Sequence, residues 1–170
     1  GVAGVEVGTE KAVSYAQEFN IGQAFLINKL DRERASFERS LESIHEFFGR
    51  TAIPVHLPIG GEKNFSGIVD LVTMKAYTYT PGGDGKGKEG EIPVDLADAA
   101  KTAHEALIEM VAEGNDALME EFFDKGTLPV EHIIEGLQQG ISERRIFPVL
   151  CGSAYQNIGT DRLLSFFVDY

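Results

Sequence analysis

The sequence predicts an α/β fold in which a partial parallel sheet is interrupted by an inserted α+β subdomain. Three observations lead to this prediction. Apolar runs of strand length alternate with helical patterns between residues 9 and 59, which is typical of a parallel sheet. Short strands of alternating polarity and three helical patterns then follow between residues 60 and 144. A further apolar run begins at residue 146 and restores the first pattern.

The first part of the chain is expected to contain two helices and two strands. Thr9 to Phe19 has helical periodicity, and the Thr9 hydroxyl is suited to cap the helix start. Gln23 to Ile27 is expected to be a buried strand. Phe37 to Phe48 carries apolar residues at helical spacing and precedes Gly49, which favours helix termination. Ile53 to Ile59 is expected to be the second strand.

The middle of the chain is expected to combine a β-hairpin with three helices. Phe65 to Leu71 and Lys75 to Tyr79 alternate in polarity and are joined by a short segment, which predicts an antiparallel pair. Pro81 to Gly90 is rich in Gly and Lys and is expected to be a mobile loop. The helical patterns span Leu96–Val111, Leu118–Phe123 and Val130–Ile141.

The parallel pattern resumes with a strand at Ile146–Cys151 and a last helix at Asp161–Val168. This order predicts two units. Residues 1–59 and 145–170 would form one α/β domain, and residues 60–144 would form the insert.

The tetrapeptide Asn28-Lys29-Leu30-Asp31 follows the first predicted strand, and such an Asn-Lys-x-Asp turn is typical of proteins that bind GTP. The Asp31 carboxylate can accept hydrogen bonds from guanine N1–H and the exocyclic amine. Adenine lacks this donor pair, so a buried carboxylate would reject it by roughly 10⁴-fold or more. Asn28 can bind the ring nitrogen and tie the neighbouring loop, and the Lys29 stem can lie over the base. The alternative is a polar turn in which Asp31 caps the next helix.

A second loop, Gly152-Ser153-Ala154, follows the strand predicted at Ile146–Cys151. The Ala154 N–H can donate to the guanine carbonyl oxygen, and the Ser153 hydroxyl can steady the Asp31 carboxylate. Gly-Ser-Ala alone is weak evidence. Two such loops in this order favour a guanine site over a plain polar turn.

Composition excludes several classes of function. The net charge of −12, from 27 acidic and 15 basic residues, is wrong for a nucleic-acid-binding surface and compatible with a basic protein partner. The one cysteine, Cys151, excludes an internal disulfide and is consistent with a reducing cytoplasm. No apolar run approaches the roughly 20 residues of a membrane span, and no signal peptide is visible. Gly1 looks like the inside of a longer sequence, so we expect an excised fragment, monomeric and cytoplasmic.

Other candidate sites are weak, and we predict neither a catalytic residue nor a metal site in this chain. Gly82 to Glu89 nearly matches the phosphate-binding Gly-x₄-Gly-Lys-Ser/Thr loop, but Glu89 replaces the magnesium-binding hydroxyl. No buried strand precedes this segment, so we interpret it as a hairpin tip. The histidines are single and lack metal-ligand spacing: His45, His56, His104 and His132.

Carboxylates are dense between Asp95 and Asp124. Such a run is usually a solvated helix face, and the alternative is a docking surface for a basic partner. The residues that we expect to bind this partner are Asp98, Glu105, Glu109 and Glu113.

Together these segments resemble bacterial elongation factor G, the ribosomal translocase of the translational GTPases. The resemblance covers almost the whole chain. It rests on Gly4-Val5-Glu6, Gly8-Thr9-Glu10, Asn28 to Arg32, Leu57 to Gly60, Phe65 to Val72, Lys75-Ala76-Tyr77, and Cys151 to Ala154 with Asn157 and Gly159.

The resemblance implies a partial P-loop GTPase-type sheet with an inserted subdomain, and GTP or GDP as the ligand of the parent protein. It also implies that helices of the insert contact the mobile stalk protein of the large ribosomal subunit. The acidic segment from Asp95 to Asp124 is the matching one. Val7-Gly8 stands where translocases usually have Pro-Gln, and this form is more similar to a second, paralogous elongation factor G.

The chain contains no phosphate-binding loop, no switch threonine and no Asp-x-x-Gly segment with its catalytic histidine. The Mg²⁺ site of the family is therefore expected outside this chain, and the chain alone is not expected to hydrolyse GTP, although the parent would. Two alternatives stay open. The chain could be a protein-binding module only, or it could be part of a release-factor or ribosome-protection GTPase.

Overall fold

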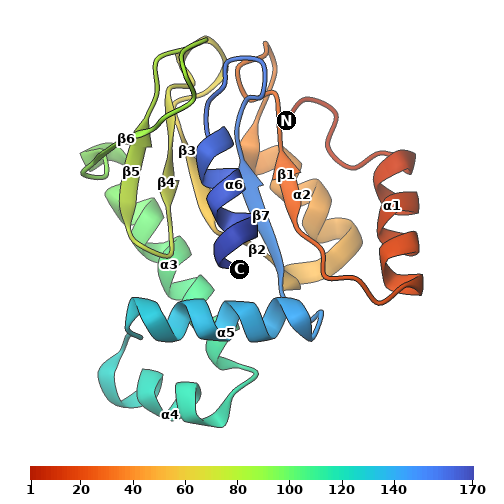
Figure 1. Ribbon diagram of the computed structural model, residues 1–170, viewed down its shortest axis with the longest axis vertical. Helices are drawn as coiled ribbons and strands as arrows, with labels where there is room; N and C mark the ends of the chain where they lie inside the picture. The colour runs from red at the N-terminus through yellow and green to blue at the C-terminus, as the bar shows by residue number, and fades with distance from the viewer.

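Two sheets make up the centre of the molecule, which a computed structural model describes over residues 1–170 (Figure 1). The parallel sheet has the strand order β1-β7-β2. Its strands are β1 (Phe25–Ile27), β7 (Phe147–Cys151) and β2 (Ala52–Pro54). The antiparallel sheet has the order β3-β4-β5-β6. Its strands are β3 (His56–Ile59), β4 (Gly67–Asp70), β5 (Lys75–Thr78) and β6 (Lys88–Gly90). This arrangement confirms the predicted fold class.

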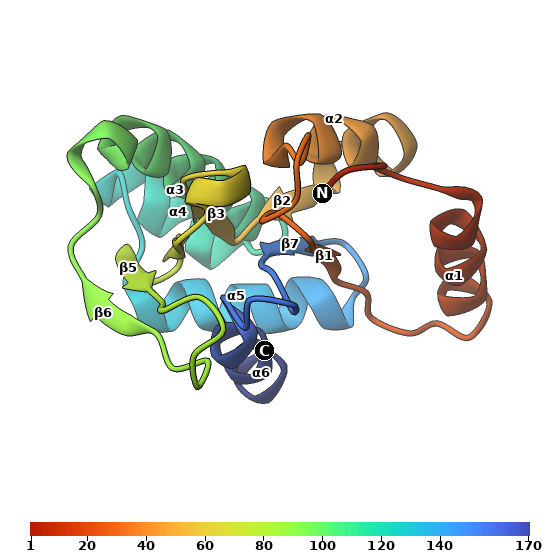
Figure 2. The same ribbon diagram turned by 90° about the horizontal axis from the view of Figure 1, so that it is seen from above.

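Helices cover both faces of the parallel sheet. Figures 1 and 2 show α6 on one face and α2 on the other, with α5 crossing one end of the sheet and α4 beyond it. Helix α1 stands apart at the side and buries no residue. The helices are α1 (Val7–Glu18), α2 (Phe37–Phe48), α3 (Ala97–Ala112), α4 (Asp116–Lys125), α5 (Val130–Ser142) and α6 (Thr160–Asp169). Gly49 follows α2 with a φ of 72°, as expected of a terminating glycine.

The first two predicted elements are shifted or shortened. Glu6, not Thr9, is the N-cap of α1, and the Thr9 hydroxyl instead accepts a hydrogen bond from the Glu6 N–H at 3.5 Å. The strand predicted at Gln23–Ile27 forms only over Phe25–Ile27, and just Ile27 is buried. The prediction of a buried strand is wrong because β1 pairs only with β7 and lies at the sheet edge.

The single strand predicted from Ile53 to Ile59 is wrong, because the chain changes sheets at Val55. The Val55 N–H donates to the Val149 carbonyl in the parallel sheet at 3.0 Å. The Val55 carbonyl accepts from the Leu71 N–H next to the antiparallel sheet at 2.9 Å. The apolar run is continuous across this change, so its periodicity carries no sign of it.

The hairpin predicted within the insert is confirmed, since β4 and β5 pair antiparallel with Val69 opposite Ala76. The segment after it is not a loop throughout. Lys88 to Gly90 forms β6 against β5, so the loop prediction for Pro81 to Gly90 is wrong at its end. The rest is the hairpin tip that we expected, and hydrogen bonds hold it against the start of α6.

The two apolar cores run through both predicted units. The larger core joins Ile53 and Leu150 of the parallel sheet to Leu107 and Ile133 of the helices α3 and α5. The smaller core joins Val149 to Ile68 of β4. The antiparallel sheet begins at His56, a little before the predicted start of the insert at residue 60. The division into two domains stays a prediction.

Candidate nucleotide site

The two candidate loops lie side by side because their strands are neighbours. β1 and β7 pair parallel with Ile27 opposite Cys151, so both chains leave the sheet at the same edge. Figure 1 shows these loops together at the top of the sheet. We call residues 28–34 the base loop and residues 152–159 the closing loop. The Gly152 N–H donates to the Ile27 carbonyl at 3.1 Å, and the Leu30 N–H donates to the Gly152 carbonyl at 3.4 Å.

Asp31 and Ser153 are hydrogen-bonded across the two loops. The Ser153 hydroxyl donates to Asp31 Oδ1 at 2.5 Å and accepts from the Gln156 N–H at 3.1 Å. Ser153 is buried, and the Asp31 side chain is only 10% exposed. The alternative role of Asp31 as a helix cap is wrong, because Ser36 is the N-cap of α2. Asp31 Oδ2 does not share the Ser153 bond and is the oxygen left for other donors.

Asn28 makes the second link between the loops. Its Oδ1 accepts from the Lys29 N–H at 2.7 Å and from the Ala154 N–H at 3.0 Å. We predicted from the sequence that Asn28 would tie the neighbouring loop, and the hydrogen bond from the Ala154 N–H makes this connection. The Ala154 N–H, which we expected to meet a guanine oxygen, points at Asn28 Oδ1 instead. A bound base would have to share this donor or take it over.

Lys29 has a φ of 64°, a left-handed conformation that is uncommon outside glycine. Its side chain is exposed, so the aliphatic stem is free to lie over a base. The turn thus gives each of its three candidate residues a separate position. Asn28 faces the closing loop, Lys29 faces solvent, and Asp31 lies against Ser153.

Sequence reasoning missed two residues at this site, Arg32 and Tyr155. The Arg32 guanidinium lies 5.2 Å from the centre of the Tyr155 ring, a cation–π distance. Arg32 Nε also lies 3.8 Å from Asp31 Oδ2. The two residues are far apart in sequence, and although Arg32 ends the segment Asn28 to Arg32, no local signal indicated that Tyr155 would meet it.

The site is a shallow surface site and not a deep pocket. A small cavity of about 50 Å³ lies beside the loops and is lined by residues that include Leu26, Asn28, Ser153 and Thr160. The polar groups that would meet a base are the backbone and side-chain atoms of the two loops. Chemically, this surface site offers one carboxylate oxygen, one amide side chain and backbone donors in one small area.

The remaining titratable candidates lie elsewhere. Cys151 is buried in the smaller core, and burial raises the pKa of its thiol. His56 is also buried, and burial lowers its pKa to about 4. No group of three or more His, Cys, Asp or Glu side chains is placed to hold a metal ion.

The acidic residues expected to bind a partner lie on α3 and at its end. Glu105 and Glu109 follow Asp98 by seven and eleven residues, which places the three on one helix face. Glu105 lies 4.0 Å from Lys101, and Glu113 lies 3.3 Å from Arg50, both as exposed ion pairs. Asp98 and Glu109 have no ion-pair partner.

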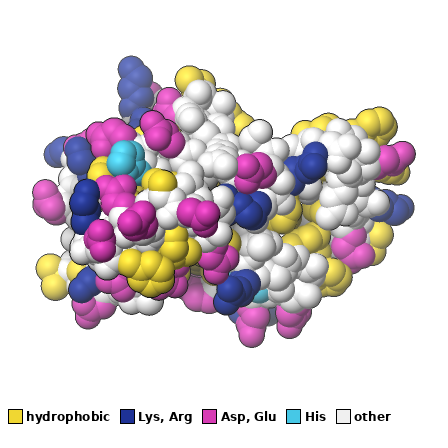
Figure 3. All heavy atoms as spheres, turned by 90° about the horizontal axis from the view of Figure 1, so that it is seen from below, with side chains coloured by type: hydrophobic (Ala, Val, Ile, Leu, Met, Phe, Trp, Pro, Cys, Tyr) yellow, Lys and Arg dark blue, Asp and Glu magenta, His cyan; other side chains and the backbone are white.

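One acidic side chain of α4, Glu121, has basic partners. Glu121 accepts from Lys125 at 2.7 Å and pairs with His132 at 2.6 Å. Figure 3 shows carboxylates on the face below α4 and α5, with Lys and Arg side chains among them. Unpaired negative charge therefore remains on both helices, at Asp98 and Glu109 of α3 and at the exposed residues Asp116, Glu120 and Asp124 of α4.

A parallel sheet whose neighbouring strands end in these two loops is the architecture of a GTP-binding domain. The chain belongs to the elongation factor Tu GTP-binding domain family, whose model matches residues 1–170. The chain is therefore part of a GTP-binding domain of the translational GTPase class. None of its helices has the length and apolar character needed to cross a membrane.

The fold is similar to a solved structure. A crystal structure of a protein from Thermus thermophilus superposes with a TM-score of 0.86 over 98% of this chain, at 24% sequence identity. The chain spans 24% of the length of that protein. At this identity, the likeness establishes the fold alone.

Proposed function

We propose that this chain carries the guanine-recognition half of the GTP-binding domain of a ribosomal translocation factor of the elongation factor G family. The observation that carries this proposal is the pair of loops joined by Ser153 to Asp31 and by Ala154 to Asn28. The family membership supports a guanine nucleotide as the ligand. GTP or GDP would be bound by the parent protein, whose Mg²⁺ ligands we place outside this chain.

In this proposal each residue has one role. Asp31 accepts from guanine N1–H and the exocyclic amine, and Ser153 fixes the carboxylate in the orientation that this requires. Asn28 binds the ring nitrogen, the Ala154 N–H donates to the base carbonyl, and the Lys29 stem covers the base. Because a buried carboxylate left without donors is costly, the site would reject adenine.

The experiment is a change of base specificity in the complete factor. Asp31→Asn replaces one acceptor by an amide donor, which suits the extra carbonyl of xanthine. We expect weaker binding of GTP and stronger binding of xanthosine triphosphate, measured as competition against a fluorescent nucleotide. Glu33→Gln, an exposed carboxylate in the same loop, is the matched control. Unchanged preferences in Asp31→Asn would show that Asp31 does not read the base.

We further propose that α3 docks the basic stalk protein of the large ribosomal subunit. The support is the face of Asp98, Glu105 and Glu109, of which only Glu105 has an ion-pair partner, together with Glu113 at the helix end. Single exposed pairs contribute roughly 0.2–1 kcal/mol each. Several together would steer the encounter and raise the association rate.

A groove beside α3 adds apolar surface to this face. This groove lies between α2 and α3 and has a volume of about 770 Å³. Its lining includes Leu41 and Leu57 and three carboxylates of α2: Glu38, Glu42 and Glu46. An adjoining hollow of about 570 Å³ shares His45 and Ala99 with it and includes Asp98. Acidic edges around an apolar floor would suit a basic partner with apolar side chains.

Within this proposal the chain itself does not hydrolyse GTP, because its sequence lacks the phosphate and Mg²⁺ contacts on which phosphoryl transfer depends. Hydrolysis would belong to the parent, working as a monomer on ribosomes in the cytoplasm. The Val7-Gly8 pair favours the paralogous form of elongation factor G over the main translocase.

A further inference from the structure

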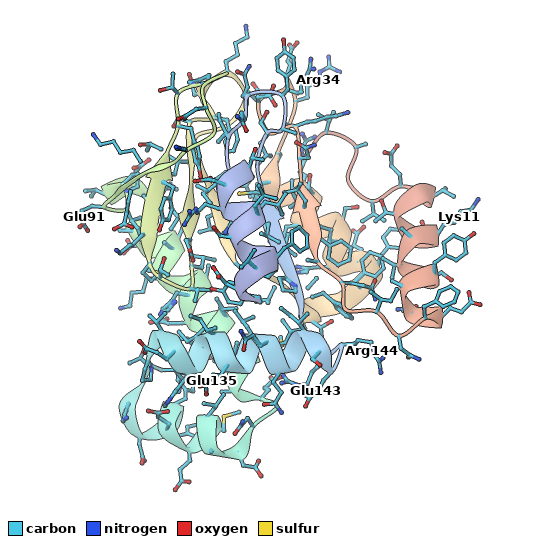
Figure 4. All side chains as sticks on the ribbon, in the orientation of Figure 1. Lys11, Arg34, Glu91, Glu135, Glu143 and Arg144 are labelled. Carbon is cyan, nitrogen blue, oxygen red and sulfur yellow. The ribbon has the colours of Figure 1, made fainter.

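The base loop is held by a turn of the predicted insert. This turn is the short 3-10 helix η2 (Glu62–Asn64), which follows β3. The Glu62 N–H donates to the Leu30 carbonyl at 2.9 Å, and the Arg34 N–H donates to Glu62 Oε1 at 2.7 Å. One residue therefore bonds the base loop on both sides of Asp31. Figure 4 shows Arg34 at the same edge of the molecule as the ends of β1 and β7.

The start of α6, directly after the closing loop, is held by a second turn of the insert. Residues 79–87, between β5 and β6, form this hairpin loop. Asp161, in the first turn of α6, accepts from the Tyr79 hydroxyl at 2.6 Å and from the Gly87 N–H at 3.0 Å. Both views of the ribbon show the β5–β6 turn beside the start of α6 (Figures 1 and 2).

The hairpin loop also bonds the closing loop directly. The Gly82 N–H donates to the Gln156 carbonyl at 2.8 Å, and the Asn157 side-chain amide donates to the Gly83 carbonyl at 3.1 Å. Gln156 in turn donates its own N–H to the Ser153 hydroxyl. A continuous chain of hydrogen bonds thus runs from the hairpin loop to the residue that orients Asp31.

The environment of Asp161 keeps it in the charged form that accepts these bonds. Burial alone would raise its pKa, but the hydrogen bonds from Tyr79, Gly87 and the Arg162 N–H outweigh burial, and its pKa is lowered. The Arg162 guanidinium lies 4.6 Å from the centre of the Tyr77 ring, which fixes the first turn of α6 against β5. Asp161 is therefore held at the joint between the sheet and the closing loop.

We propose that Glu62 and Asp161 are positioning residues for the base, and that the insert sets how long a guanine nucleotide stays bound. This inference rests on the proposed function. Asp31 and Ala154 come from different loops, so reading one base requires a fixed spacing between them. Ordering both loops in advance removes an entropy cost that nucleotide binding would otherwise bear.

The first test needs no nucleotide and uses the 170-residue chain. Amide hydrogen exchange is measured for residues 152–159 in Tyr79→Phe, which removes only the hydroxyl that Asp161 accepts. Tyr15→Phe on the exposed side of α1 is the matched control. Losing one such bond should speed exchange in the closing loop about tenfold and leave the centre of α5 unchanged. Equal exchange in Tyr79→Phe and the control would overturn the proposal for Asp161.

The second test measures the rate of GDP dissociation in the complete factor. Glu62→Ala should release GDP about tenfold faster, while Glu62→Gln, which keeps an acceptor for the Arg34 N–H, should restore most of the loss. The preference for guanine over xanthine should not change in either variant. If Glu62→Ala releases GDP at the normal rate, Glu62 is not a positioning residue. If instead Asp31→Asn leaves the base preference unchanged, the proposed function fails. The hydrogen-exchange test still shows whether Asp161 and the hairpin loop order the closing loop.

Discussion

The Ser153 hydroxyl lies 2.5 Å from Asp31 Oδ1, although 122 residues of chain separate the two. This bond is the closest tie between the base loop and the closing loop. It accounts for the orientation of a carboxylate whose own neighbours in sequence make no hydrogen bond to it.

Ser153→Ala in the complete factor should weaken GDP binding about tenfold to a hundredfold, because a hydrogen bond to a charged group contributes roughly 1.5–3 kcal/mol. Titration with a fluorescent GDP analogue measures the change. Ser142→Ala, at the exposed end of α5, is the control. Normal GDP affinity in a folded Ser153→Ala protein would mean that the Asp31 carboxylate does not need this bond.

The 170-residue chain by itself should bind GDP and GTP no tighter than millimolar and should not hydrolyse GTP. The reason is that contacts to the base alone leave the charged phosphates in water. Calorimetry with both nucleotides tests the affinity, and phosphate release tests hydrolysis. A micromolar dissociation constant would contradict this prediction.

Charge reversal on α3 should slow ribosome-stimulated GTP turnover of the complete factor. Asp98→Lys with Glu109→Lys changes the two carboxylates that lack an ion-pair partner, and we expect a loss of about fivefold to tenfold at low salt. The loss should shrink as salt rises, because screening at ~0.15 M acts over about 8 Å.

The matched control reverses two exposed glutamates of α1, Glu10 and Glu18, which also have no ion-pair partner and stand apart from α3 (Figure 1). Intrinsic GDP affinity should be normal in both double variants. Equal turnover in the α3 and α1 variants would leave the acidic run as a solvated helix face.

His56 should make the folded chain less stable as pH falls from about 6.5 toward 4. Burial lowers its pKa to about 4, with Asp70, Asp161 and Arg162 as the charged groups around it. Because the folded pKa lies below the unfolded one, the unfolded chain binds more protons in this window. The free energy of unfolding therefore drops there by at most ~1.4 kcal/mol per pH unit.

Denaturant unfolding at several pH values measures this slope. Carboxylates with a lowered pKa, such as Asp161 and Glu121, also make the folded chain less stable at low pH. The informative quantity is therefore the difference in slope between the unchanged chain and His56→Gln. The variant should lack the part of the slope that lies between the two His56 pKa values. Parallel curves for both proteins would show that His56 is not the group responsible.

The sequence predicted those features that local chemistry determines. The apolar spacing of Phe37 to Phe48 with Gly49 gave the right helix, and the alternating pattern around β4 and β5 gave the right hairpin. The two candidate loops could be brought together in advance, because adjacent parallel strands end at one edge.

Features that depend on distant partners were not predictable in this way. The change of sheet at Val55 lies within an unbroken apolar run, and the hydrogen bonds that define it are made with the distant residues Val149 and Leu71. Likewise, nothing around Asp161 signals that Tyr79 and Gly87 donate to it from the hairpin loop. The Arg32–Tyr155 contact has the same origin, since its two members meet only after the sheet has formed.

Val55 donates its N–H within the parallel sheet and accepts at its carbonyl from Leu71, the residue directly after β4, and it is 1% exposed. Separating the two sheets at this point would break one of these two hydrogen bonds, and the larger core extends across the same junction. We therefore expect the two sheets to unfold as one cooperative unit, with the Val55 and Leu71 amides among the slowest to exchange. On that expectation, a force applied to the helices of the predicted insert would be transmitted to the parallel sheet by a rigid body and not absorbed by a hinge.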